Sequence, residues 1–204
     1  MDKSIEALFG SKTRVKLLNL FLNNPEKTFY VREITRLIDE QVNSVRRELK
    51  NLEDIKAVNS ATEDRKLFYG INQRFKYYIP LRAIFAGIDV DEESIIKEKE
   101  QGWMYDTSDI DKDLGILIIS GVLVKGSESD IDMILVGNNS KKHLSDWAKN
   151  IEKQEGRDLN YVILSMEEFY YRYTSSDVFI NGIFQNEHRI IVDREGILKN
   201  KERR

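Results

Sequence analysis

Two aspartates separated by one residue are the first candidates for chemistry in this sequence. Asp130 and Asp132 stand at the start of an apolar run that ends at Val136. Residues two apart on a strand project to the same side, so both carboxylates can bind a single Mg²⁺. An ion held in this way can bridge a triphosphate and activate an attacking oxygen.

A glycine-containing turn precedes these aspartates and follows a second apolar run, residues 114–120. Such a turn lets backbone and hydroxyl groups approach a phosphate closely. The candidate nucleotide-binding residues are Gly121, Lys125, Gly126 and Ser129. Asp130 and Asp132 are the candidate metal ligands, so the implied ligands are Mg²⁺ and a nucleotide. The alternative interpretation of an Asp-x-Asp pair is a capped turn between two strands.

The stretch ILIISGVLVKGSESDIDMILVG, residues 116–137, resembles the minimal nucleotidyltransferases of the DNA polymerase beta superfamily. That family joins an apolar strand, a Gly-Ser pair, a basic loop and a Ser-Asp-apolar-Asp segment that leads into a second strand. This chain has Val122 where the family has Ser, and its loop before Asp130 is a few residues short. Asn160 takes the place of the third carboxylate, although Asp158 could face the same side.

With these departures, the resemblance implies a nucleotidyltransferase-like domain without catalytic activity, used for dimerisation or for sensing a nucleotide or other small-molecule effector. Two alternatives stay open. An active Mg²⁺-dependent nucleotidyltransferase would use Asp130 and Asp132 and would recruit its acceptor through the N-terminal part of the chain. An antitoxin-like protein would pair with a small helical toxin, as related minimal domains do.

A second group of candidate residues shares one face of a helix predicted to end near Asp54. The apolar residues of this helix are spaced three or four apart, which places them on the opposite face. Arg and Lys can contact DNA phosphates or base edges, and Asn and Gln can pair with adenine. The candidate residues for binding double-stranded DNA, including two at the tip of a following hairpin, are Gln41, Asn43, Ser44, Arg46, Arg47, Lys50, Arg65 and Lys66.

The segment FYVREITRLIDEQVNSVRRELKNLED and the hairpin after it resemble the winged helix–turn–helix family of small bacterial and archaeal regulators. The resemblance implies that the third helix enters the major groove of DNA and that the hairpin is the wing. Protein binding by the same module is the alternative. Glu48 and Asp39 lie close to the basic residues and would weaken their positive field.

Helical spacing and turn residues place the elements of the first 85 residues. We expect a helix over 5–21, interrupted near Gly10, an extended segment at 28–30, a helix over 31–39 and a helix at 81–86. Strands are predicted at 55–60 and 66–71, around a turn at 61–65. The predicted inward positions of the helices include Leu8, Val31, Ile34, Leu37, Ile38, Val42, Val45, Leu49 and Leu52. The cluster Tyr77, Tyr78, Ile79, Leu81, Ile84 and Phe85 could form a homodimer seam or an interdomain contact.

The second half of the sequence alternates strands and helices, which indicates a small mixed sheet. The predicted strands are 114–120, 131–136, 159–164 and 189–192, and the predicted helices are 142–154, 167–172 and 178–185. Trp147, Phe169, Tyr170 and Val178 are predicted to pack in the core. The predicted fold class is therefore α+β or α/β, with a winged-helix domain at 1–85, a connector at 86–113 that contains a helix at 92–101, and a nucleotidyltransferase-like domain at 114–204.

Composition agrees with two modules of different character. Residues 1–85 carry 16 Lys and Arg against 11 Asp and Glu, and residues 86–204 carry 16 against 24. A basic first part favours a polyanionic partner. The sequence has no Cys, so thiolate metal sites and disulfides are excluded, and its two His, His143 and His188, are predicted to be isolated surface residues. Without a signal peptide or a long apolar stretch, a cytoplasmic protein with no membrane partner is expected.

Overall fold

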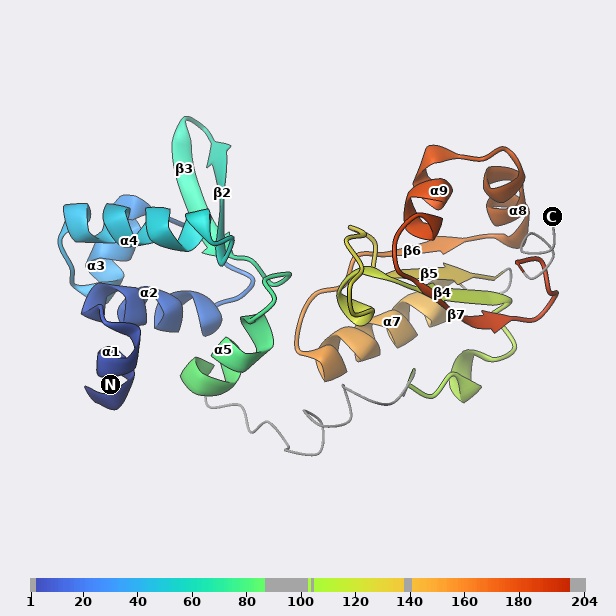
Figure 1. Ribbon diagram of the computed structural model, residues 1–204, viewed down its shortest axis with the longest axis horizontal. Coiled ribbons are helices and arrows are strands. Elements are labelled where there is room, and N and C mark those ends of the chain that lie inside the picture. Colours follow the sequence, from blue (N-terminus) through green and yellow to red (C-terminus); the bar gives the residue numbers. More distant parts are fainter. Residues whose placement is uncertain (1–2, 87–102, 104, 138–140, 199–204) are drawn as a thin grey trace. The chain divides into compact units, whose positions relative to one another are not determined.

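The chain forms two compact units, residues 1–99 and 100–204, and each has its own hydrophobic core (Figure 1). The computed structural model describes residues 3–86, 103, 105–137 and 141–198. The helix predicted at 92–101 lies outside the described residues. Both units mix helices and sheets, which confirms the predicted fold class.

The N-terminal unit has the element order of a winged helix. Its elements are α1 (Lys3–Phe9), α2 (Lys12–Leu22), β1 (Phe29–Tyr30), α3 (Val31–Ile38), α4 (Val42–Asp54), β2 (Val58–Glu63), β3 (Lys66–Ile71) and α5 (Tyr78–Ala86). The break predicted near Gly10 is confirmed, since Ser11 caps α2 by accepting a hydrogen bond from the backbone N–H of Arg14. Pro80 lies in the first turn of α5, where a missing N–H costs no helical hydrogen bond.

The turn between α3 and α4 is short because Asp39 adopts a left-handed conformation, with φ at 50°. Asp tolerates this conformation better than most residues. Lys16 of α2 fixes the turn, because its Nζ donates to the carbonyl oxygen of Ile38 at 2.7 Å and pairs with Glu40 at 2.8 Å. A cation at a helix C-terminus also interacts favourably with the helix dipole. Lys16 therefore ties α2 to the turn between α3 and α4.

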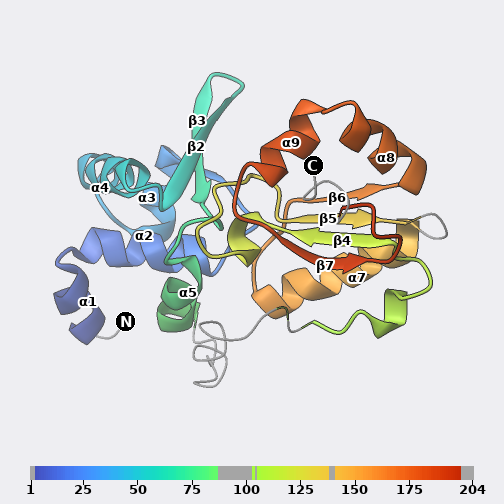
Figure 2. The same cartoon turned by 45° about the vertical axis from the view of Figure 1, so that its right-hand side comes forward.

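The hairpin of β2 and β3, which is the predicted wing, is tighter than the sequence pattern predicts. The prediction of a five-residue turn at 61–65 is wrong, because β2 continues through Glu63, which pairs with Lys66. Asp64 and Arg65 form the turn alone, and both have positive φ angles, as a two-residue hairpin turn requires. Strand β1 adds to the other edge of β3, in the order β1-β3-β2. Figure 2 shows the hairpin extending beyond the helices of its unit.

The core of the N-terminal unit contains most of the predicted apolar positions. Ile34, Val45 and Leu49 are fully buried, and α2 contributes Val15, Leu17, Leu18, Phe21 and Leu22. For three residues the prediction of an inward position is wrong, because Leu8, Leu37 and Val42 are 82%, 56% and 39% exposed. All three lie in the first or last turns of their helices, where helical spacing continues but neighbouring elements no longer cover the side chain.

The C-terminal unit is built on a four-stranded sheet in the order β6-β5-β4-β7. Only the β5–β6 pair is parallel, so the sheet is mixed, as predicted. Its elements are the 3₁₀ turns η1 (Ser108–Ile110) and η2 (Gly121–Leu123), the strands β4 (Ile116–Ile119), β5 (Met133–Val136), β6 (Tyr161–Leu164) and β7 (Arg189–Asp193), and the helices α7 (Lys141–Glu155), α8 (Met166–Thr174) and α9 (Val178–Phe184).

Helices cover both faces of this sheet, α7 on one face and α8 with α9 on the other (Figures 1 and 2). The side chains of β4 and β5 alternate between the two cores, with Leu117 and Leu135 toward α7, and Ile116 and Ile134 toward α8 and α9. Burial on both faces explains why the two strands are continuous apolar runs. The prediction that Trp147 and Phe169 pack in the core is confirmed, because both are buried.

Two predictions for the outer helices are wrong. Tyr170 is 56% exposed and Val178 is 87% exposed, so neither belongs to the core. Val178 follows Asp177, which caps α9, and the first residue of a capped helix faces outward here. Residues 103 and 105–113, predicted as connector, contribute to the core beside α7, where Ile110 is fully buried and the indole of Trp147 donates to the carbonyl of Asp106. None of the described helices is both long enough and apolar enough to cross a membrane.

Candidate functional site

Helix α4 separates its side chains into a buried row and an exposed row. Val45, Leu49 and Leu52 are buried in the core of the N-terminal unit. The exposed row consists of Asn43, Arg46, Arg47 and Lys50, with Gln41 exposed at the N-cap and Ser44 half-buried. The side chain of Gln41 makes no capping hydrogen bond, although Gln41 is the N-cap residue. Six predicted site residues therefore lie on or just before one helix, and all of them except Ser44 are exposed.

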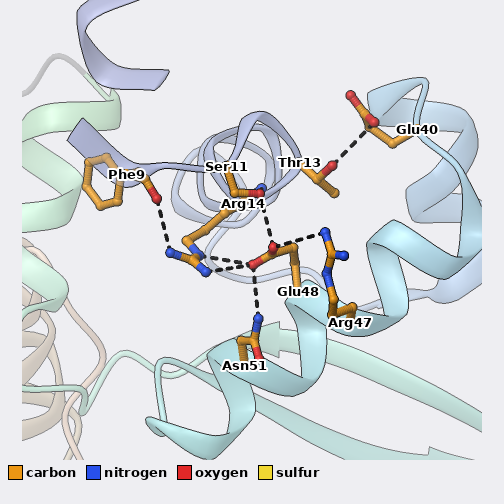
Figure 3. A network of polar contacts seen from close by, with 8 residues as sticks. All are labelled: Phe9, Ser11, Thr13, Arg14, Glu40, Arg47, Glu48 and Asn51. Carbon is orange, nitrogen blue, oxygen red and sulfur yellow. Dashed lines mark hydrogen bonds and ion pairs between the residues drawn. The ribbon is translucent and has the colours of Figure 1, made fainter. Parts of the chain in front are cut away.

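One acidic residue of α4 is buried, and it anchors the helix to α2. Glu48 is 3% exposed, and its carboxylate receives hydrogen bonds from Ser11 at 3.0 Å, from Arg14 Nε at 3.0 Å and from Asn51 at 3.3 Å (Figure 3). Arg14 also donates through Nη1 to the carbonyl oxygen of Phe9 at 3.0 Å. A buried carboxylate needs several such partners. The network thus ties α4 to the start of α2 and to the end of α1.

This network also holds Glu48 in its charged form. Burial by itself raises the pKa of Glu48, but hydrogen bonds from Asn51, Ser11 and Arg14, together with the charge of Arg14, lower it below its ordinary value. A similar effect lowers the pKa of Glu40, mainly through its hydrogen bond with Lys16. Both carboxylates are therefore internal partners of α2 cations.

Glu48 is expected from the sequence to weaken the positive field of the neighbouring cations, but its side chain is buried. Its carboxylate is turned inward toward Arg14. Its Oε1 also lies 3.8 Å from Nη2 of Arg47, within ion-pair distance, although the side chain of Arg47 is 71% exposed. The only hint in the sequence was position, since Glu48 stands between Val45 and Leu49 on the apolar side of the helix.

The tip of the wing carries the two remaining candidate DNA contacts. Arg65 and Lys66 are both exposed, in the turn and at the first position of β3. The Nζ of Lys66 lies 5.6 Å from the ring centroid of Tyr30, a cation–π contact between β3 and β1. Glu63 and Asp64 are exposed beside them, so the tip is mixed in charge.

The C-terminal candidates form a different kind of arrangement, centred on a fully buried carboxylate. Asp132 has no exposed surface. Its Oδ1 accepts from the backbone N–H of Val122 and its Oδ2 from the backbone N–H of Asn160, each at 2.8 Å. These amides belong to the turn after β4 and to the segment before β6. Asp132 therefore joins three consecutive strands of the sheet at one end.

Gly121 is required for this arrangement. It adopts a left-handed conformation with φ at 53°, and a Cβ at this position would collide with the carboxylate of Asp132 and with two carbonyl oxygens. Its own N–H donates to Ser127 Oγ at 2.9 Å. The two amides that could cradle a phosphate, those of Gly121 and Val122, are thus engaged by side chains of the same loop.

The other predicted residues of this site do not converge with Asp132. Asp130 is exposed, as are Lys125 and Gly126, whereas Ser129 is buried and donates to the carbonyl of Ile131. The side-chain amide of Asn160 donates to the backbone carbonyl of Asp130 at 2.8 Å, so it closes the turn. Within the described ranges, no group of three His, Asp or Glu side chains is arranged to hold a metal ion.

One pair in the C-terminal unit was missed by sequence reasoning. His143, predicted to be isolated, has its Nδ1 2.8 Å from Asp113 Oδ2. The partners are 30 residues apart and come from α7 and from the segment before β4. The pair links the start of α7 to the segment that leads into β4, and no local pattern could have indicated it.

Comparisons with known proteins yield little. Neither protein-family models nor curated proteins match the chain. Among solved structures it is similar to MepR, a transcription regulator of the Staphylococcus aureus multidrug efflux pump MepA, at 17% identity and a TM-score of 0.36, over 48% of this chain and 78% of that one. A MepR mutant from a multidrug-resistant S. aureus clinical isolate gives 16% identity and the same TM-score, over 49% and 72%. Likeness at this level supports no inference about the present chain.

Proposed function

We propose that the N-terminal unit binds double-stranded DNA and that the chain is a DNA-binding transcriptional regulator. The observation that carries this proposal is the division of α4 into a buried apolar row and an exposed row with three cations. A helix built in this way can enter the major groove, where Arg46 and Arg47 reach base edges or phosphates. Asn43 and Gln41 are suited to adenine.

The buried network supports the same role. A recognition helix must be held rigidly if its side chains are to discriminate between bases. Glu48 ties α4 to Arg14 and Ser11 of α2, and its charge is compensated inside the unit. The exposed charges at the centre of the helix are therefore the positive ones, and the wing adds Arg65 and Lys66 for contacts with the DNA backbone.

The proposed regulator acts as a homodimer on a site with twofold symmetry. Two apolar side chains on the surface of the N-terminal unit, Leu8 of α1 and Ile84 of α5, are 82% and 50% exposed. Surfaces of this kind are suited to pairing with a second copy. Light scattering on the full chain measures the mass directly, and a monomer at micromolar concentration would contradict this part of the proposal.

In this proposal the C-terminal unit is a nucleotidyltransferase-like module without catalytic activity, used for dimerisation or for sensing a ligand. The hydrogen bonds of Asp132 favour this role, since both carboxylate oxygens serve backbone amides of the same fold. Calorimetric titration with MgATP and MgGTP tests it, with Asp130→Asn as the variant. Heat of binding that the variant abolishes would show a nucleotide site that depends on Asp130, and transfer of a radiolabelled nucleotide would then favour the enzyme alternative.

The DNA-binding proposal is tested by selecting bound duplexes from a random library and measuring affinity by fluorescence anisotropy at fixed salt. Arg46→Ala with Arg47→Ala should weaken specific binding by about 1–3 kcal/mol for each hydrogen-bonded base that the arginines no longer reach. The matched control is Lys149→Ala with Lys153→Ala, two exposed cations of α7. Equal affinity of the two double variants would contradict the assignment of α4.

A further inference from the structure

A cavity of about 380 Å³ opens in the N-terminal unit beside the C-terminal half of α4. Its walls come from α1, α2, α4 and α5, and from the segments before and after the wing. Ala57 forms part of the wall and is itself buried. The volume falls at the lower end of the range for small-molecule sites in proteins.

The lining is apolar and rich in aromatic rings. Phe9, Phe75 and Tyr77 contribute the rings, and Leu18, Leu52 and Leu81 contribute aliphatic surface. Phe75 and Tyr77 contact each other edge to face at 5.6 Å, which fixes one side of the cavity. Ile55 lies in the wall and is 58% exposed, so it stands at the mouth. Such a lining is suited to a flat, mainly apolar molecule.

Two polar side chains complete the wall, and both belong to the Glu48 network. Arg14 and Asn51 line the cavity and also donate to the carboxylate of Glu48 (Figure 3). In the described part of the chain, Arg14 uses Nε and Nη2 for Glu48 and Nη1 for the carbonyl of Phe9, which engages three of its five N–H groups. The guanidinium can therefore donate to one more acceptor from the cavity side.

We infer that this cavity binds a small, flat, uncharged aromatic molecule with one hydrogen-bond-accepting oxygen directed at Arg14. A neutral acceptor fits better than a carboxylate, because Glu48 already neutralises Arg14 and would repel a second anion nearby. A protein partner is disfavoured by the small volume and by the polar end of the cavity, which an internal ion pair closes.

Occupation of the cavity has a consequence for α4. A ligand oxygen that accepts from a further N–H of Arg14 draws the guanidinium toward the cavity and shifts the hydrogen bonds that fix α4 against α2. The bound molecule therefore lowers the affinity for DNA, and this second part rests on the proposed function. Ligand binding itself does not depend on DNA and can be measured alone.

The test uses 2-naphthol as the neutral probe and 2-naphthoate as the anionic one, titrated into ¹⁵N-labelled full-length protein without DNA. We expect 2-naphthol to shift amide signals of residues around the cavity and of Glu48, and to bind more tightly than 2-naphthoate. Ile55→Glu should weaken binding about tenfold or more, since it replaces apolar surface at the mouth by a charge. Leu37→Glu, at a leucine of α3 that is 56% exposed and outside the cavity, should change affinity less than about twofold.

Each result has a definite meaning. Signal changes confined to other parts of the chain, equal effects of the two glutamate variants, or tighter binding of 2-naphthoate would overturn the inference. A dimer that Ile55→Glu converts to a monomer in light scattering would also overturn it, because the cavity would then be a subunit interface. Loss of DNA binding on adding 2-naphthol supports the coupling, whereas ligand binding without any DNA binding would refute the proposed function and leave the cavity as a site.

Discussion

The two units bury one carboxylate each at the centre of a candidate site, and the consequences are opposite. In the N-terminal unit, Glu48 faces side chains from another helix and leaves the exposed cations of α4 directed at solvent. In the C-terminal unit, Asp132 faces backbone amides of the glycine turn and engages the groups that a phosphate would need. The first burial leaves a positively charged surface exposed, and the second closes a loop upon itself.

A carboxylate in a recognisable pattern therefore does not by itself indicate a site. What matters is which groups remain accessible after the carboxylate has been satisfied. Around Glu48 these are Arg46, Arg47 and Lys50, and around Asp132 they are Asp130 and Lys125 at the rim of the turn. Substitutions in both units test this contrast, and those with the greatest expected cost come first.

Removing the carboxylate of Asp132 should have the largest effect. Asp132→Ala leaves two backbone N–H groups without their acceptor in a fully buried place, and we expect a loss of about 3–5 kcal/mol in stability. Urea unfolding followed by tryptophan fluorescence measures this, since both tryptophans, Trp103 and Trp147, belong to the C-terminal unit. Asp130→Ala, at an exposed aspartate, is the control and should change stability by less than about 0.5 kcal/mol.

Gly121→Ala tests the same loop by adding a methyl group where Asp132→Ala removes a carboxylate. The new methyl group would meet the carboxylate of Asp132, and the backbone would be strained at its positive φ. We expect a loss of about 2–4 kcal/mol in the same fluorescence-monitored unfolding, and Gly196→Ala, also at positive φ but in open space, should cost about 1 kcal/mol. Equal losses of stability in the two variants would mean that the collision with Asp132 does not contribute to the cost of Gly121→Ala.

Glu48→Ala should destabilise the N-terminal unit by about 2–3 kcal/mol, because Arg14 loses its internal counter-ion and Asn51 its acceptor. Hydrogen exchange of peptides from α2 and α4, followed by mass spectrometry, localises the loss. Asp54→Ala, at an exposed acid at the end of the same helix, is the control. Unchanged protection of α4 in Glu48→Ala would contradict the anchoring role.

Lys50→Ala should weaken DNA binding moderately and uniformly across sequences. If Lys50 contacts a phosphate, the slope of log affinity against log salt concentration should fall by about one unit. Anisotropy titrations over a series of salt concentrations measure the slope. An unchanged slope together with a loss confined to the selected sequence would instead assign Lys50 to base contacts.

The smallest expected effect is on the loss of stability at acidic pH. The pKa of Glu48 and that of Glu40 are lowered in the folded chain, so their contribution is complete above the ordinary value of 4.5 and is lost as the pH falls through the folded pKa. Glu48→Gln should therefore give a flatter decline of melting temperature between neutral pH and about pH 3 than the unaltered protein. An identical decline would show that Glu48 contributes nothing to this dependence.

Much of the local structure could be predicted from the sequence because its causes lie within a few residues. Ser11, Ser165 and Asp177 cap the helices that follow them, as their types and positions indicate. Helical spacing located the buried row of α4, and continuous apolar runs located β4 and β5. The polar candidates of α4 were found in the same way, since the two faces of a helix are fixed by its period.

The orientation of the decisive side chains depends on contacts between distant parts of the chain. Glu48 meets Ser11 and Arg14 across 37 and 34 residues of sequence, and Asp132 meets Asn160 across 28. Whether a carboxylate faces solvent or an internal donor depends on where these distant segments lie, and the helical or strand period does not contain that information. Local sequence therefore established which elements form and which residues are candidates, whereas tertiary packing decided which candidates are anchors and which remain open to a partner.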